Sequence, residues 1–244
     1  MERTKHYLIP LLFIFISVNM AASYRTDIYN AYITNRMDLW KKVIDVMQGD
    51  NFKNDALAEL INYQYGYIGY CIGFEKKDEA RKYLNLAERN LEILEKGKYD
   101  PSMIKAYKCA FYGFRLGLNK FTAPVNGLKS LENAKSALAI DSTNYFAWIQ
   151  YGNVQFYMPA TFGGSKKEGI EYFLKAKKIM EKHPDELINN WNYLSLLVLI
   201  GQSYTYINDT PSAKRVYESI LEREPAFLYV KNELYPELLK KMNN

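Results

Sequence analysis

Residues 197–225 read LVLIGQSYTYINDTPSAKRVYESILEREP, and this stretch decides the fold that the sequence predicts. It holds two apolar segments of 3.6-residue period on either side of a turn at Thr210-Pro211. At this turn, as at Asp100-Pro101, a capping side chain is predicted to precede a proline at the first helical position. Gly201 and Ala213 are small residues, one on each segment, and they allow two antiparallel helices to cross closely. Pro225 cannot continue a helix and ends the second segment. The stretch therefore predicts a helical hairpin.

The same arrangement recurs upstream at a constant interval. Tyr112-Gly113 recurs as Tyr151-Gly152 after 39 residues, and Ala137 recurs as Ala176 after the same 39 residues. A fixed period of this length indicates stacked repeats, each of which buries its apolar face against its neighbours. The 3.6-residue periodicity covers almost the whole chain without convincing strand alternation, so the predicted class is all-α.

The hairpin at residues 197–225 matches the tetratricopeptide pattern. The matching residues are Leu197, Ile200, Gly201, Tyr204, Ala213, Tyr217 and Pro225. The chain resembles a tetratricopeptide-repeat protein over roughly residues 60–225. The earlier units, with Gly69, Gly113 and Gly152 at the crossing position, fit the pattern more loosely. The stretches YGYIGYCIG and PATFGG are similar to those of exported repeat proteins of Bacteroidetes-type bacteria. This resemblance implies helical hairpins stacked as a short right-handed superhelix, an α-solenoid.

The N-terminus has the order of a secretory signal peptide. Arg3 and Lys5 precede the apolar run 8–18, and small residues follow at Ala21-Ala22-Ser23. The run has 11 residues, whereas a membrane-spanning helix needs about 20. We predict a signal peptide over residues 1–23, cleaved after Ala22 or Ser23, and no lipid anchor because no cysteine lies near that point. The alternative is an uncleaved anchor. The predicted location is periplasmic or extracellular, with no stable membrane insertion after cleavage.

Three further segments complete the predicted organisation. Residues 24–58 form an N-terminal helical cap or a degenerate repeat, and the amphipathic run from Asp38 to Met47 is expected to cover the first repeat. Residues 59–225 form four helix pairs of the tetratricopeptide type. Residues 226–244 form a C-terminal capping helix.

Charge and cysteine content exclude some functions and leave one question open. The chain has 32 basic and 27 acidic side chains, and the small excess is dispersed along it. Such a pattern is typical of a solvated surface, so we expect no nucleic-acid partner. Cys71 and Cys109 are the only cysteines. Both lie in apolar helical patterns, where a free thiol packs as a small hydrophobe, but a disulfide is conceivable in an exported protein.

The stretch PATFGGSKKEG at residues 159–169 allows two interpretations. Two glycines, a serine and two lysines before a helix could hold an anion. However, the crossing residues are 17 positions apart in the two middle units, from Gly113 to Ser130 and from Gly152 to Gly169, but only 12 apart in the last unit, from Gly201 to Ala213. The stretch is therefore mainly an enlarged turn. It also lacks the glycine spacing and the preceding strand of a phosphate-binding loop. We predict a turn, with Ser165 capping the next helix and with the ammonium groups of Lys166 and Lys167 in solvent.

No recognised set of catalytic or metal-binding residues is present in the sequence. His183 is the only histidine after the signal segment, and it lies beside a proline at a helix junction. There is no HExxH or CxxC motif and no nucleophile elbow. We therefore predict a protein that is not an enzyme and has no cofactor or metal.

Aromatic and amide side chains are predicted to line a concave groove. In tetratricopeptide arrays the first helix of each pair faces this groove, and the crossing glycines set the register. The predicted groove residues are Tyr63, Tyr70, Tyr107, Phe114, Phe146, Asn153, Tyr157, Gln202 and Tyr206. Tyrosine supplies contact area and a hydroxyl at low entropic cost. The main hypothesis is a scaffold that binds an envelope protein or an extended peptide, and the alternative is a periplasmic receptor for a small apolar or aromatic ligand.

Overall fold

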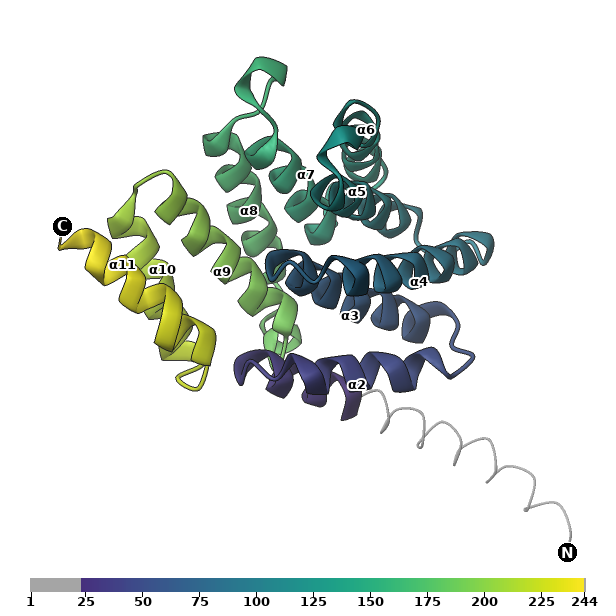
Figure 1. Ribbon diagram of the computed structural model, residues 1–244, viewed down its shortest axis with the longest axis horizontal. Helices are drawn as coiled ribbons and strands as arrows, with labels where there is room; N and C mark the ends of the chain where they lie inside the picture. The colour runs from purple at the N-terminus through teal and green to yellow at the C-terminus, as the bar shows by residue number, and fades with distance from the viewer. Residues whose placement is uncertain (1–22, 244) are drawn as a thin grey trace, which may run out of the picture.

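The computed structural model describes residues 23–243, and its regular secondary structure in that range is entirely helical (Figure 1). Residues 23–33 are helical and precede α2. The α-helices that follow are α2 (Met37–Gln48), α3 (Asn54–Gly73), α4 (Lys77–Lys96), α5 (Pro101–Leu118), α6 (Ala123–Ile140), α7 (Tyr145–Tyr157), α8 (Lys166–Met180), α9 (Trp191–Tyr206), α10 (Thr210–Arg223) and α11 (Tyr235–Met242). Consecutive helices pack against each other, which confirms the all-α repeat fold. The predicted signal peptide lies largely outside the described residues.

Local capping side chains set the helix starts. The predicted cap at Asp100 is confirmed, but α10 is capped by Asp209, which accepts a hydrogen bond from the Ser212 N–H, and not by the predicted Thr210. The Asp100 carboxylate accepts hydrogen bonds from the backbone N–H groups of Ser102 and Met103, at 2.8 and 3.1 Å, and Pro101 follows it at the first helical position. Asn144 and Asn190 cap α7 and α9 in the same way. These side chains satisfy backbone donors that a helix start leaves unpaired.

The last two hairpins cross where the sequence predicts. A Cβ atom added to Gly201 would lie 2.3 Å from Cε1 of Tyr217, and one added to Gly152 would lie 2.5 Å from Cε1 of Phe173. The Gly152 position is also 3.1 Å from the carbonyl oxygen of Gly169. Only glycine leaves room for these helix pairs.

The first two hairpins differ from the predicted crossing. Nothing lies within 4 Å of a Cβ atom added to Gly113, and for Gly69 the nearest atom is Cζ of Phe114 at 3.9 Å. In the α5–α6 hairpin the close contact instead joins Cys109 and Ser130, since the Ser130 hydroxyl donates to the Cys109 carbonyl oxygen at 2.9 Å. The crossing on α5 is therefore one turn earlier than the glycine suggested.

The PATFGG stretch forms a turn, as predicted. Pro159 precedes a short 3-10 helix, η2 (Ala160–Phe162), and Gly163 follows with φ +90°, a conformation that glycine adopts readily. A Cβ atom on Gly164 would lie 1.9 Å from the Met158 carbonyl oxygen, so this position also requires glycine. The Ser165 hydroxyl then accepts a hydrogen bond from the Glu168 N–H and caps α8.

The N-terminal helix at residues 23–33 joins the two ends of the array. The Tyr29 hydroxyl donates to the Glu224 carboxylate at 2.7 Å, and the Arg25 guanidinium donates to the carbonyl oxygens of Glu186 and Ile188 at 2.8 and 3.0 Å. Trp40 of α2 and Trp191 of α9 pack edge to face with ring centroids 4.8 Å apart. Figure 1 shows α2 beside the start of α9 at the bottom of the molecule. The array is therefore not open at this end.

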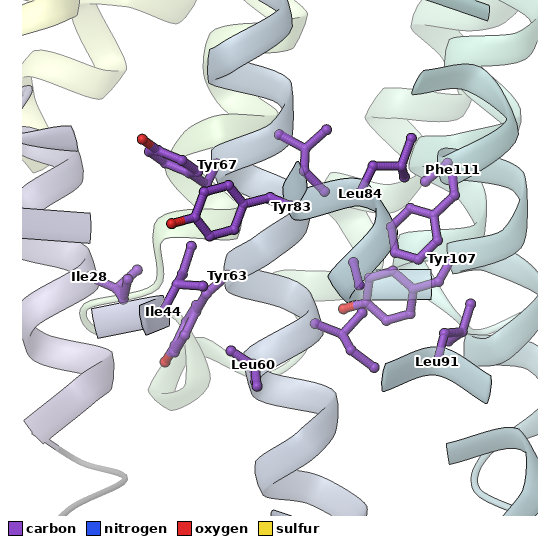
Figure 2. Packing of buried hydrophobic residues seen from close by; sticks show 14 of the residues in the cluster. Ile28, Ile44, Leu60, Tyr63, Tyr67, Tyr83, Leu84, Leu91, Tyr107 and Phe111 are labelled. Atoms are coloured by element: carbon purple, nitrogen blue, oxygen red, sulfur yellow. The ribbon is translucent and has the colours of Figure 1, made fainter. Parts of the chain in front are cut away.

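The core consists of two hydrophobic clusters. One is formed mainly by the helices from the N-terminal end to α5, together with residues such as Phe146 and Trp191, and the other mainly by the later helices, together with Ile33. Tyr29, Tyr32 and Tyr145 pack against both clusters and connect them. Figure 2 shows the first cluster, in which tyrosines from α3, α4 and α5 lie among leucine and isoleucine side chains. Many of the chain's 22 tyrosines therefore contribute to helix packing.

Candidate ligand-binding site

Three of the predicted groove residues lie in the core. Tyr63, Tyr107 and Phe146 are 1%, 4% and 4% exposed. Figure 2 places Tyr63 and Tyr107 inside the packed cluster, and the Tyr107 and Phe146 rings lie 4.7 Å apart. Burial raises the pKa of Tyr107 well above its usual value. Tyr107 and Phe146 therefore offer almost no surface to a ligand, whereas Tyr63 lines a hollow between residues 23–33, α3 and the start of α9.

Two further predicted residues are partly buried beside them. Phe114 stacks on Tyr65 with centroids 5.3 Å apart. The Tyr70 hydroxyl accepts a hydrogen bond from the Lys76 ammonium group at 3.1 Å, and the Tyr70 ring lies 4.7 Å from Phe74. Both side chains already have partners within the chain.

The remaining four predicted residues lie on the later part of α7 and of α9. Tyr157 and Tyr206 end these helices and are 66% and 65% exposed. Asn153 and Gln202 precede them by four residues, so each amide lies on the same helix face as its tyrosine. Gln202 also donates to the Tyr229 hydroxyl at 3.3 Å.

Phe156 and Lys166 bring the two tyrosines together. The buried Phe156 ring lies 5.1 Å from Tyr157 and 5.4 Å from Tyr206. The Lys166 ammonium nitrogen lies 5.7 Å from the Tyr157 ring and 5.1 Å from the Tyr206 ring, and it donates a hydrogen bond to the Phe156 carbonyl oxygen. A cation over aromatic faces is attracted by their quadrupoles. We name the set of Tyr157, Tyr206, Phe156, Lys166, Asn153 and Gln202 the α7–α9 patch.

The position of Lys166 corrects one expectation. Both lysines of the PATFGGSKKEG stretch were expected to be solvated, but only Lys167 is exposed, while Lys166 is half-buried against the patch. The cap at Ser165 places Lys166 in the first turn of α8, so its location on the helix follows from sequence. The direction of its side chain depends on the position of α9, and a local sequence pattern does not specify that position.

Two hollows lie elsewhere on the molecule. One of about 170 Å³ lies between α4 and α5, and one of about 260 Å³ lies between residues 23–33, α3 and the start of α9. Pockets for drug-sized ligands usually occupy about 300–1,000 Å³. The walls of the larger hollow include Arg25, Glu59 and Glu186, and neither hollow coincides with the α7–α9 patch.

The described residues contain little that suggests chemistry or metal binding. Within 23–243, no group of three or more His, Cys, Asp or Glu side chains could hold a metal ion. Cys71 and Cys109 are free and buried, and burial raises the pKa of their thiols to about 11 and about 12. His183 is exposed beside η3 (Pro184–Leu187). No helix in this range is long and apolar enough to cross a membrane.

Comparison with known proteins finds similarity at the level of the fold. No protein-family model matches the chain, and no curated protein matches its sequence. Among solved structures, the HusA haemophore from Porphyromonas gingivalis superposes with a TM-score of 0.58 at 18% identity, over 76% of this chain and 93% of that chain. The chain shares the fold of a haemophore. At this identity the match shows the fold alone.

Proposed function

We propose that this chain is an exported, non-catalytic binding protein that carries a flat, largely apolar aromatic ligand of the porphyrin class on the α7–α9 patch. The observation that carries the proposal is the pair of exposed tyrosines, Tyr157 and Tyr206, gathered around Phe156 and Lys166. The similarity to a haemophore supports the same ligand class. We further propose that the repeats are of the tetratricopeptide type, because Gly201 and Tyr217 pack as that pattern requires.

Each part of the patch suits such a ligand. Tyrosine rings offer faces for an aromatic macrocycle, and a tyrosine oxygen can ligate haem iron. The Lys166 ammonium group lies beside the rings and could pair with an acidic substituent. The amides of Asn153 and Gln202 supply hydrogen-bonding groups one helical turn away.

An extended peptide along the whole concave face is the weaker hypothesis. It needs a continuous groove across the first helix of every pair. Tyr63, Tyr107 and Phe146, which would form the first part of that groove, are buried. The helix at residues 23–33 also bridges the two ends of the array.

Absorbance titration with haemin tests the proposal, with iron-free protoporphyrin IX as a second ligand. We expect saturable binding of one ligand per chain and a shifted Soret band. The Tyr157→Phe/Tyr206→Phe pair keeps the rings and removes both hydroxyls, so it should change the haemin spectrum but leave protoporphyrin binding nearly intact. The corresponding alanine pair should weaken the binding of both ligands by about tenfold or more, which corresponds to roughly 1.4 kcal/mol.

Tyr172→Phe is the matched control, because this partly exposed tyrosine stacks on Tyr151, 4.8 Å away, outside the patch. It should leave both titrations unchanged. Porphyrin binding that is retained in the double alanine variant would show that the binding site lies outside the patch. Absence of binding by both porphyrins, together with retention of an envelope protein that the alanine pair abolishes, would favour the peptide hypothesis.

A further inference from the structure

The two enlarged turns each present a phenylalanine to solvent. Phe121 lies in η1 (Lys120–Thr122), between α5 and α6, and is 96% exposed. Phe162 ends η2, between α7 and α8, and is 77% exposed. Val125 and Leu128 on the first turns of α6 are also exposed, so apolar side chains continue from the first turn onto the helix. Single exposed apolar residues are ordinary, but a set of this kind marks an interaction surface.

Both turns lie at the same edge of the array. Helices α5 and α7 are the first helices of consecutive stacked hairpins, so the repeat gives them the same direction. They pack side by side, with the ring centroids of Tyr107 on α5 and Phe146 on α7 4.7 Å apart. The two turns follow the opposite ends of these helices. In Figure 1 the α7–α8 turn projects beyond the helices at the top of the molecule. The surface thus consists of projecting tips and not of a groove.

The charge around these tips is mainly basic, and the nearest carboxylates along the chain are Glu132 and Glu168. No aspartate or glutamate occurs in residues 101–131 or in residues 142–167. Lys120 and Lys129 flank the first turn, Lys167 follows the second, and all three are exposed. By contrast, the turn that carries Phe74, between α3 and α4, has mixed charges, with acidic residues at 75, 78 and 79 beside Lys76 and Lys77.

We propose that the edge formed by the α5–α6 and α7–α8 turns docks on an anionic phospholipid surface. Phe121 and Phe162 enter the boundary between headgroups and acyl chains, where amphipathic surfaces insert apolar side chains. Lys120 and Lys167 lie at the level of the lipid phosphates, and basic residues near an anionic leaflet are attracted to it. Projecting tips with a basic surround suit a fluid, deformable surface better than a rigid protein partner.

Vesicle co-sedimentation tests this docking, using the protein purified after export from a bacterial host. Vesicles of phosphatidylcholine alone are compared with vesicles that contain phosphatidylglycerol. We expect binding to the anionic vesicles only, weakened by salt. Lys120→Gln/Lys167→Gln should weaken it about fivefold for each lysine, the equivalent of roughly 1 kcal/mol per basic residue. Phe121→Ser/Phe162→Ser should weaken it about tenfold, because both rings lose their apolar contact.

Phe74→Ser is the matched control, since it removes an exposed phenylalanine from a turn in which three acidic side chains offset Lys76 and Lys77. It should not change binding, and melting curves should show that all variants remain folded. Failure to bind anionic vesicles would overturn the proposal. So would binding that is unaffected by the Phe121/Phe162 changes, because charge alone would then explain it. Capture of an envelope protein through these residues, without vesicle binding, would assign the edge to a protein partner. Porphyrin titration of the same variants should be unchanged, so the outcome does not depend on the proposed function.

Discussion

Alanine substitution of Gly152 should destabilise the protein, whereas alanine substitution of Gly113 should stabilise it. The two glycines lie 39 residues apart at equivalent positions of consecutive repeats, on α7 and α5. An alanine in a helix interior is favoured over glycine by about 0.5–1 kcal/mol, and this gain applies to both sites. The sites differ only in their surroundings.

The surroundings give the magnitude. At Gly152 the new methyl group would lie 2.5 and 2.6 Å from two carbon atoms of the buried Phe173 ring and 3.1 Å from a backbone oxygen. Relief requires the ring or the helix to move, and overpacking of this kind costs about 1–3 kcal/mol. At Gly113 nothing lies within 4 Å, so no such cost arises. The helix-propensity gain cancels in the comparison, and the free energies of unfolding of the two variants should differ by about 1–3 kcal/mol.

Urea denaturation followed by helical circular dichroism measures the difference. Thermal melts provide a check, since a protein of this size shifts its Tm by about 2–4 °C per kcal/mol. Equal stabilisation of both variants would refute the close crossing at Gly152. Destabilisation of the Gly113 variant would show instead that α5 has a close neighbour at that position.

Three further outcomes are expected. Tyr29→Phe should lower the free energy of unfolding by about 1–2 kcal/mol, because the Glu224 carboxylate loses a donor at 2.7 Å. A double-mutant cycle with Glu224→Gln measures the coupling, and a coupling of zero would contradict the end-to-end contact. Burial raises the thiol pKa values of Cys71 and Cys109 to about 11 and about 12, so neither thiol should react with Ellman's reagent at neutral pH until the protein unfolds. A disulfide in the native mass spectrum would be inconsistent with these free thiols. Lys166→Ala should lower the free energy of unfolding by about 1 kcal/mol, and Lys166→Met, which keeps the apolar stem, should restore part of this loss. Equal stability of the original protein and both variants would mean that the Lys166 ammonium group makes no stabilising contact with the aromatic rings.

Local chemistry determined the helical fold from sequence alone. Caps such as Asp100, the proline after it and the 3.6-residue apolar period act within one or two turns, so the helix starts could be predicted without knowledge of the packing. The crossing at Gly201 was predictable as well, because its partner Tyr217 belongs to the same hairpin. The turn at PATFGG followed from two glycines whose backbone no other residue fits easily.

Contacts between separate hairpins decided which side chains remain accessible. Tyr107 and Tyr206 are both tyrosines on first helices and were predicted to face the same groove, yet one is buried and the other is 65% exposed. The difference arises because Phe146 of the next repeat packs on Tyr107, while Tyr206 lies at the end of its helix, near the Lys166 ammonium group. The helix at residues 23–33 reaches Glu224 across 195 positions of sequence. A repeat pattern specifies how each hairpin folds, but the exposure of a side chain depends on atoms from other hairpins, and their positions are set only when the whole array packs.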